Sequence, residues 1–285
     1  MPKLSVVVPF HNVGPYAPDT VRSLALNADP DFEFLLVDDC STDETPDVLD
    51  RWKDRIPNAR VIRHETNLGV AQARNTGIDA STGDYVTFLD GDDWYAPAKV
   101  RDAVMDPRDG IAPASMITMV DYPFVPFGVY GRTLFEDGAS RFETTLRTAE
   151  DRLWVWRLHL KARTYAALSL HGVFYRRGVT TSLTQISDNR QLDFIPSYDL
   201  LLAEVSRDRD ADRFLPKAVR TYCAMIAFHV NKAGKYEPEV AERLRADVAD
   251  ALRRMPQDVL EDTLATMDTP RATLLRSLRE TGRTL

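Results

Sequence analysis

Acidic side chains crowd at residues 90–93, where Asp90, Asp92 and Asp93 directly follow the almost wholly apolar segment 85–89. Neighbouring carboxylates repel one another and lose hydration on burial, so they need a cation or several hydrogen-bond donors nearby. Carboxylate oxygens suit Mg²⁺ or Mn²⁺, and these ions commonly complete their shell with water and a substrate diphosphate. The Asp-x-Asp spacing therefore predicts a divalent-cation site; the alternative is an acidic turn that caps the next helix.

A second acidic pair, Asp38 and Asp39, follows the apolar segment 32–37. Short β-branched segments alternate with helical patterns through roughly the first hundred residues, which is typical of βαβ units and a mainly parallel sheet. Ligands of such sheets bind beyond the carboxyl ends of the strands. We therefore expect residues 9–13, Asp38 with Asp39, and residues 90–93 to share one edge of the sheet.

The elements that position these residues follow from periodicity and capping signals. Ser41 and Glu44 have the spacing of a capping box, Asn67 can cap the helix that follows it, and Pro9 ends the first strand. The expected strands are 4–8, 32–37, 60–63, 85–89, 116–120, 164–170 and 173–176. The expected helices are 21–26, 41–53, 68–80, 148–160, 200–206, 214–232, 238–255 and 274–283, and residues 122–138 are expected to be irregular or an edge hairpin.

The composition is that of a globular protein, with 44% hydrophobic and 28% charged residues in a chain of 285. This length allows one large domain or one domain with an appendage. We expect a sheet-containing domain over residues 1–196 and a helical region over 197–285. The helical region is expected to pack on the sheet domain or on another subunit, so a homo-oligomer is one outcome.

Charge and cysteine content exclude several classes of protein. The 43 Asp and Glu outnumber the 36 Lys and Arg, and a net charge of −7 argues against binding to nucleic acid. Cys40 and Cys223 are far apart, which excludes a disulfide scaffold or a zinc ribbon and fits a reducing cytoplasm. The apolar run near the N-terminus is too short for a membrane span, so any membrane contact must be peripheral.

Phosphate-binding glycine motifs are missing from the sequence. No Gly-x-Gly-x-x-Gly follows the first strand, and no Gly-Lys-Ser/Thr occurs anywhere. A phosphate group must therefore be bound in another way than in dinucleotide-binding or P-loop proteins.

Four ordered motifs carry a resemblance to a known family. They are residues 5–12 (SVVVPFHN), 37–45 (VDDCSTDET), 67–77 (NLGVAQARNTG) and 83–93 (GDYVTFLDGDD). Together they resemble family 2 glycosyltransferases, closely over residues 3–100 and more loosely over 148–185. The resemblance implies an α/β protein of the GT-A fold, Rossmann-like, with a mainly parallel central sheet flanked by helices and a C-terminal helical extension.

The resemblance also implies that the domain over residues 1–196 binds a nucleotide sugar and carries the catalytic site. Asp39, with Asp38 beside it, would accept a hydrogen bond from the uracil N3–H of a UDP-sugar. Asn67 and Arg74 would border the nucleotide. The alternatives are that Asn67 is only a helix cap and that Arg74 is only an exposed helical arginine. Pro9, His11 and Asn12 would line the nucleotide, largely through backbone groups. Asp90 would reach the ribose or a metal-bound water, with Gly91 beside it. Asp92 would coordinate the metal.

A catalytic base is expected from the pair Glu150 and Asp151 at the start of a predicted helix. The resemblance assigns Asp151 to take the proton from the acceptor hydroxyl, as transfer with inversion requires. The helix dipole favours the charged form of Asp151 and the neighbouring Glu150 opposes it. The alternative is that both acids only balance the dipole.

Other residues near this helix are weaker candidates. At most one of Trp154 and Trp156 is expected to meet substrate, because positions two apart on a helix face different directions. Arg176 or Arg177 would stabilise charge on the leaving group. His171 is either a third metal ligand or a structural histidine.

Taken together, the sequence predicts a cytoplasmic, metal-dependent inverting transferase. It would move a sugar from a UDP-sugar to a hydroxyl of a glycan or polyol polymer, as bacterial relatives do on cell-surface polysaccharides or teichoic-acid-like polymers. A catalytically silent nucleotide-sugar-binding or scaffold protein and a sugar-phosphate nucleotidylyltransferase are the alternatives. The acids at positions 92 and 151 speak against the first, and the lack of a Gly-rich, Arg-bearing loop after the first strand speaks against the second.

Overall fold

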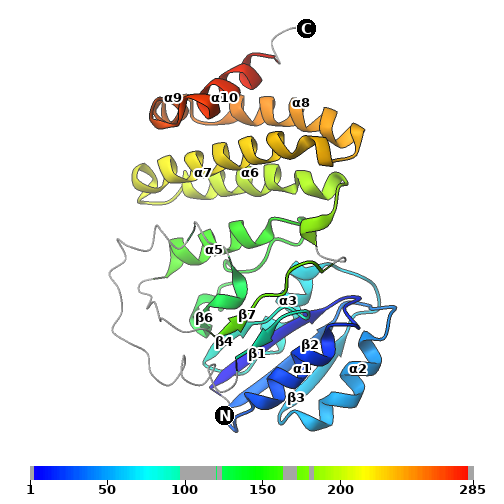
Figure 1. Ribbon diagram of the computed structural model, residues 1–285. Coiled ribbons are helices and arrows are strands. Elements are labelled where there is room, and N and C mark those ends of the chain that lie inside the picture. The colour runs from blue at the N-terminus through cyan, green and yellow to red at the C-terminus, as the bar shows by residue number, and fades with distance from the viewer. Residues whose placement is uncertain (1–2, 97–119, 121–123, 163–171, 180–182, 282–285) are drawn as a thin grey trace. The chain divides into compact units, whose positions relative to one another are not determined.

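The computed structural model describes residues 3–96, 120, 124–162, 172–179 and 183–281 (Figure 1). The chain divides into two compact units, Met1–Ser182 and Leu183–Leu285. The sequence predicts a division at residue 196 instead. The short 3₁₀ helix η6 (Asn189–Asp193) packs against helices of the second unit, and the Glu237 amide donates to the Ser187 carbonyl at 3.1 Å, which places this segment with the helices.

The first unit is built on a five-stranded sheet with the strand order β3-β2-β1-β4-β6. Its first four strands run parallel and β6 lies antiparallel at the edge, so the expected α/β sheet is confirmed. The strands are β1 (Leu4–Phe10), β2 (Phe32–Asp38), β3 (Ala59–Arg63), β4 (Tyr85–Phe88) and β6 (Val129–Gly131). A separate antiparallel pair joins β5 (Trp94–Tyr95) to β7 (Val173–Phe174).

Helices cover both faces of this sheet (Figure 1). They are α1 (Ala17–Leu26), α2 (Thr45–Trp52), α3 (Val70–Ala80) and α5 (Glu150–Lys161). Val6 and Val8 of β1 pack into the core beneath α1 and α2, whereas Val7 packs into the core with α3 and α5. Every residue of β1 is buried, which explains why its sequence is apolar throughout rather than alternating.

Two predicted boundaries in β1 and α2 are wrong. β1 continues through Pro9 to Phe10. Proline has no N–H to donate to a neighbouring strand, but β4 pairs with β1 only as far as Val7, so no β4 hydrogen bond is lost at Pro9. The predicted capping box is not formed. Glu44 is the N-cap of α2 without a side-chain cap bond, and the Ser41 hydroxyl accepts the Asn12 amide at 3.0 Å instead.

The predicted cap of α3 is also wrong. The helix begins at Val70, and its N-cap is Gly69, with φ of 91° and no side-chain cap bond. The Asn67 side chain instead lies beside His11. A glycine suits this position because its positive φ costs other residues energy.

Some predictions fall outside the described residues. These are the strands at 116–120, apart from the buried Val120, and at 164–170. Within the predicted irregular segment, the described part contains β6 as an edge strand flanked by short 3₁₀ helices. The predicted strand at 173–176 is observed as the two-residue β7.

The second unit consists of helices, as expected. They are α6 (Phe194–Val205), α7 (Ala211–Lys232), α8 (Pro238–Arg254), α9 (Gln257–Thr266) and α10 (Thr269–Thr281) (Figure 1). The sequence misses α9 and starts α10 too late, although Pro270 in the first turn of α10 is a common start signal. In the part of the chain that the structure describes, no helix combines the length and the apolarity that a bilayer span requires.

The packing of α3 on β1 yields a stability prediction. A Cβ on Gly77 would lie 2.1 Å from Cγ1 of Val7, so Gly77→Ala must push the helix away from the strand. We expect a loss of about 1–3 kcal/mol in the free energy of unfolding, despite the better helix propensity of alanine. Urea unfolding measures this, with Gly172→Ala as control because a Cβ there meets nothing within 4 Å. Equal stability of the two variants would contradict the packing argument.

Candidate active site

The carboxyl ends of β1, β2 and β4 meet at one edge of the sheet, as the sequence predicts. Phe10 lies opposite Asp38 in the parallel register, and the Asp39 amide donates to the Phe10 carbonyl at 2.8 Å. A Cβ on Gly91 would lie 2.7 Å from the Pro9 carbonyl oxygen, so a residue without a side chain is needed for this approach. The three segments therefore form a single candidate site.

Asp39 is 2% exposed, and its carboxylate accepts hydrogen bonds from the loop before α3. The Leu68 amide donates to Oδ1 at 2.8 Å, and the Gly69 amide donates to Oδ2 at 2.7 Å. His64 Nδ1 also lies 2.7 Å from Oδ1. Each carboxylate oxygen can accept two hydrogen bonds, so Oδ2 keeps one acceptor direction beyond these contacts. Asp39 thus holds residues 68–69 in place, a role that the sequence analysis does not predict.

His64 is a site residue that the sequence analysis misses. Its Nε2 lies 2.9 Å from the Thr76 hydroxyl on α3 while its Nδ1 faces Asp39, so the ring joins two elements. The signal was available, because His64 directly follows β3 and so lies at the carboxyl edge of the same parallel sheet.

His11 is held in one tautomer by its partners. Its Nδ1 lies 2.8 Å from the backbone carbonyl of Asp39, which can only accept, so Nδ1 carries the proton. Its Nε2 then accepts from the Asn67 amide at 2.9 Å and from the Asn12 amide at 3.2 Å. The residues that the resemblance assigns to the nucleotide therefore contact one another.

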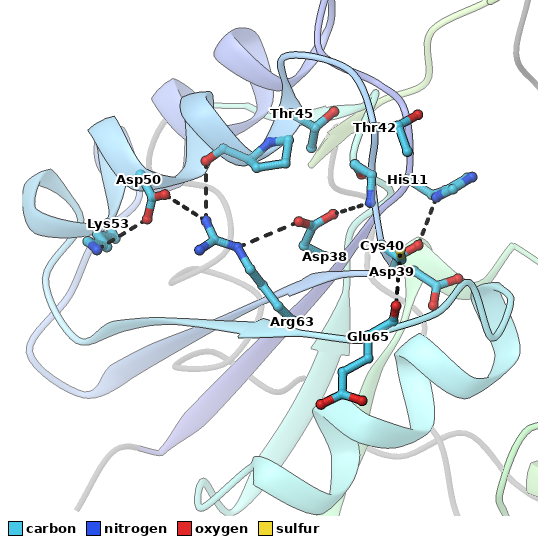
Figure 2. Close-up of polar contacts among 12 residues, drawn as sticks. His11, Asp38, Asp39, Cys40, Thr42, Thr45, Asp50, Lys53, Arg63 and Glu65 are labelled. Atoms are coloured by element: carbon cyan, nitrogen blue, oxygen red, sulfur yellow. Dashed lines mark hydrogen bonds and ion pairs between the residues drawn. The ribbon is translucent and has the colours of Figure 1, made fainter.

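Asp38 is buried beside this group. Figure 2 shows the polar contacts of its carboxylate. Its Oδ1 accepts the Ser41 amide at 3.1 Å, and its Oδ2 lies 3.7 Å from Nε of Arg63. Asn12 and Cys40 both have positive φ, of 51° and 58°, which residues other than glycine seldom adopt. The two turns of the site are thus held in unusual backbone conformations by neighbouring polar groups.

Arg74 bridges the acidic motif and the predicted base helix. Arg74 is 5% exposed, and its guanidinium donates to Asp90 Oδ1 and to Glu150 Oε1, both at 2.8 Å. It also lies over the Phe142 ring, 5.2 Å from its centroid. Although burial opposes the charge, Asp90 and Glu150 raise the pKa of Arg74 above its ordinary value. The alternative of an exposed helical arginine is therefore wrong.

Arg176 forms hydrogen bonds with protein groups in and around the acidic motif. Its amide donates to Asp93 Oδ1 at 2.7 Å, its Nε to the Asp92 carbonyl at 2.9 Å, and its Nη2 to Asp19 at 2.7 Å. The guanidinium also lies 4.7 Å from the centroid of the Trp94 ring. Arg176 thus fixes the turn, whereas Arg177 is exposed and, among the described residues, makes no hydrogen bond or ion pair.

The acidic motif fits a divalent cation. Burial, and next the charge of Asp90, raises the pKa of Asp92, and no other described residue donates a hydrogen bond to its carboxylate. Asp93 Oδ2 is buried and has no hydrogen-bond partner among the described residues, and burial raises the pKa of Asp93 to about 7. Within the described residues no three His, Cys, Asp or Glu side chains surround one point. An ion at Asp92 and Asp90 would therefore complete its shell with water and phosphate oxygens, as Mg²⁺ and Mn²⁺ do.

Glu150 and Asp151 both lie in the first turn of α5, where the sequence places them. Burial raises the pKa of Glu150 to about 7. The charge of Arg74 lowers this pKa and the charge of Asp151 raises it. Burial also raises the pKa of Asp151, although Arg152, whose amide donates to Asp151 at 2.7 Å, favours the carboxylate. A raised pKa makes the Asp151 carboxylate a stronger base.

The remaining candidates have mixed outcomes. Trp154 and Trp156 are both buried, at 0% and 2% exposure, so neither is open to substrate. The Trp154 ring stacks on Phe142 and its Nε1 donates to the Ser140 carbonyl at 2.8 Å, which makes it a core residue. His171 lies outside the described residues, and its metal role stays a prediction.

Comparison with known proteins agrees with the site. A family model described as Glycosyl transferase family 2 matches residues 5–168. The chain belongs to this family. Poly(ribitol-phosphate) beta-N-acetylglucosaminyltransferase TarS of Staphylococcus aureus (strain MW2) is 29% identical over 237 residues, which is 72% of this chain and 41% of TarS. Poly(ribitol-phosphate) beta-glucosyltransferase of Bacillus spizizenii is 28% identical over 202 residues, 61% of this chain and 32% of that protein. The chain thus spans less than half the length of these family 2 relatives.

Solved structures establish the fold of this family 2 member. The crystal structure of S. aureus TarS 1-349 in complex with UDP-GlcNAc has a TM-score of 0.78 at 22% identity, covering 98% of this chain and 88% of that one. Mannosyltransferase PcManGT from Pyrobaculum calidifontis, in complex with GDP-Man and Mn²⁺, has a TM-score of 0.54 at 20% identity over 99% of this chain and 87% of that one. The GT-A fold that the sequence predicts is confirmed.

The buried bridge of Arg74 can be tested by a charge-conserving change. In Arg74→Lys, a single ammonium cannot replace the two arms that reach Asp90 and Glu150. We expect a loss of about 3–5 kcal/mol in the free energy of unfolding, because a buried acid is left unpaired. Arg141→Lys is the matched control. Arg141 is half-buried but pairs at 2.7 Å with the exposed Asp79, so this change should cost less than about 1 kcal/mol. Chemical denaturation of both variants decides, and equal losses would show that the bridge is not needed for stability.

Proposed function

We propose that this chain is a metal-dependent inverting glycosyltransferase that moves a sugar from a UDP-sugar to a hydroxyl of a glycan or polyol-phosphate polymer. The observation that carries the proposal is the bridge from Asp90 through Arg74 to Glu150. It ties the Asp-x-Asp motif to the helix turn that holds Asp151, so one site contains both a place for a diphosphate with its cation and a half-buried base. The names of the relatives TarS and the Bacillus glucosyltransferase support the acceptor class.

The donor would bind at the edge formed by β1 and β2. In this proposal Pro9, His11 and Asn12 line the nucleotide with Asn67, and the free acceptor direction of Asp39 Oδ2 receives the uracil N3–H. Asp38 contributes indirectly, because its carboxylate accepts the Ser41 amide and so holds the backbone of this turn in place. A carboxylate acceptor favours uracil because bases that present only an acceptor at this position would face repulsion.

Groups at the end of β4 would stabilise the negative charge on the leaving group. A divalent cation held by Asp92, with Asp90 at the ribose or at a metal-bound water, would neutralise the negative charge that grows on the departing UDP. Gly91 keeps this turn close to Pro9, as its contact with the carbonyl requires. We assign the electrostatic contact with the diphosphate to Arg177 rather than Arg176, since Arg176 is already paired with Asp19.

Asp151 would take the proton from the acceptor hydroxyl as that oxygen attacks the anomeric carbon. The bond to UDP breaks on the opposite face, so an α-linked donor gives a β-linked product. The raised pKa of Asp151 strengthens this base, and Arg152 keeps its carboxylate oriented through the 2.7 Å amide contact.

Location and assembly belong to the proposal as well. Both cysteines are free, which supports a reducing compartment such as the cytoplasm, where peripheral contact with the membrane would bring the enzyme to a growing polymer. A homo-oligomer through the C-terminal helices stays a prediction.

The metal assignment predicts the behaviour of Asp92→Asn. A neutral amide cannot replace the charge of the carboxylate, so we expect the gain in UDP affinity on adding Mn²⁺ to fall at least tenfold (a loss of about 1.4 kcal/mol or more). Calorimetric titration of UDP with and without Mn²⁺ measures this gain. Asp54→Asn, an exposed aspartate in another part of the unit, should keep it. If the Asp92 variant keeps the full gain, the cation is held elsewhere.

The base assignment predicts the kinetics of Asp151→Asn. The amide keeps the size of the side chain but cannot take a proton, so kcat should fall by roughly two to four orders of magnitude while UDP-sugar affinity stays close to normal. The assay must follow transfer to an acceptor rather than hydrolysis. Glu150→Gln is the control and should lower kcat much less. Near-normal transfer by Asp151→Asn, or a larger loss with Glu150→Gln, rules out this base.

The same pair predicts a pH effect. Transfer needs ionised Asp151, so kcat/KM should rise with pH through the raised pKa of this group. Glu150→Gln frees Arg74 from one of its two acids, and the charge of Arg74 lowers the pKa of Asp151, so the acid limb of the profile should move to lower pH. A limb that moves to higher pH, or not at all, would show that another group titrates.

A further inference from the structure

A pocket in the C-terminal unit is lined by three cationic side chains. It has a volume of about 340 Å³, which is within the range of small-ligand sites. Lys232 on α7, Lys235 in the 3₁₀ turn η7 (Ala233–Lys235) and Arg271 on α10 line it, together with Phe228 and Asn231 of α7. Because α7 and α10 pack against each other, the pocket is formed within this unit alone.

The positive charge of this pocket is largely uncompensated. Among the described residues, no carboxylate forms an ion pair with Lys232 or Lys235, and Arg271 has only Asp268 at 3.5 Å. The segment 213–236 contains five Lys or Arg and no Asp or Glu, in a chain whose net charge is −7. A concentration of cations against the overall charge favours an anionic ligand.

The other lining groups narrow the class of ligand. Phe228 is 54% exposed, so its ring offers an apolar face to the C–H groups of a sugar or an alditol. Lys232 Nζ lies 5.8 Å from the ring centroids of both Phe228 and Tyr236, and these contacts keep the ammonium beside the Phe228 ring. The exposed Asn231 amide can both donate to and accept from hydroxyls. Cations, an aromatic face and an amide together match a phosphate group attached to a polyhydroxylated chain.

We propose that this pocket binds a phosphodiester unit of the acceptor polymer, as a binding site on a different unit from the one that carries Asp151. The proposal rests on the polyol-phosphate acceptor of the proposed function and adds the residues that recognise its backbone. Binding a second segment of the same polymer raises its affinity without entering the chemical step. The pocket should therefore act on KM for the polymer and leave kcat unchanged.

A polymer is favoured over an acidic bilayer as the partner. The cations and the exposed ring line a pocket of small-ligand size, which suits one segment of a single chain better than the broad surface of a bilayer. Of the described side chains that line the pocket, Phe228 is the one large exposed apolar group, which gives little area for insertion between lipids.

The test compares two variants of the full chain that lose the same charge. The first is Lys232→Gln/Lys235→Gln, with Lys235→Gln alone as a milder change at an exposed position. The control is Arg207→Gln/Arg209→Gln, in the exposed turn between α6 and α7. Binding of a synthetic oligo(ribitol phosphate) is measured by calorimetry at several salt concentrations, without donor or metal. Vesicles containing acidic phospholipid form a second arm.

We expect the double lysine variant to bind the oligomer at least tenfold more weakly, with a salt dependence shallower by about one unit of slope per lysine. The arginine control should change affinity less than threefold. Equal binding by both variants, no binding by the parent chain, or loss of vesicle binding with intact oligomer binding would each overturn the proposal. UDP-sugar hydrolysis serves as a separate readout, because failure of the proposed function would abolish it in the parent chain, whereas failure of this inference would leave it intact.

Discussion

The charge balance around Arg74 is the interaction on which the first unit depends. This buried guanidinium joins Asp90 at the end of β4 to Glu150 at the start of α5, two segments far apart in the chain. Burying any of the three charges alone would be costly, whereas the hydrogen-bonded set offsets much of that cost. Because α5 also supplies Trp154 to the core beside α3, the same helix is fixed by packing on one side and by charge on the other.

The acids of the site outnumber the cations that reach them. Arg74 pairs with Asp90 and Glu150, and Arg176 binds Asp93 through its amide, but the carboxylate of Asp92 receives no donor from another described residue. Burial, together with this excess of negative charge, raises the pKa values of Asp92 and Asp93, and the uncompensated charge leaves room for a cation. Such an arrangement costs stability in the protein alone and becomes favourable only when a ligand adds positive charge, which is a common compromise at functional sites.

Asp39 shows how one side chain can serve both the fold and the site. Its hydrogen bonds to the Leu68 and Gly69 amides hold the loop that leads into α3, the helix that carries Arg74. The nucleotide region and the acidic motif are therefore linked through the protein itself. A change at Asp39 would affect both at once, so an effect on ligand binding alone cannot define its role.

The sequence by itself determined the parallel sheet and the edge at which the site lies, because strand periodicity and the acidic residues at strand ends are local features, and parallel topology places such ends together. It also placed Asp151 in a first helical turn, since that signal depends on a few adjacent residues. Only the tertiary structure decided that Arg74 is buried between Asp90 and Glu150, that Arg176 is tied to Asp19, and that His64 faces Asp39. It also replaced the expected caps, because Ser41 and Asn67 found partners across the site rather than along their own helices. These outcomes depend on which charges and polar groups meet after distant segments pack, and local propensity carries no information about such meetings.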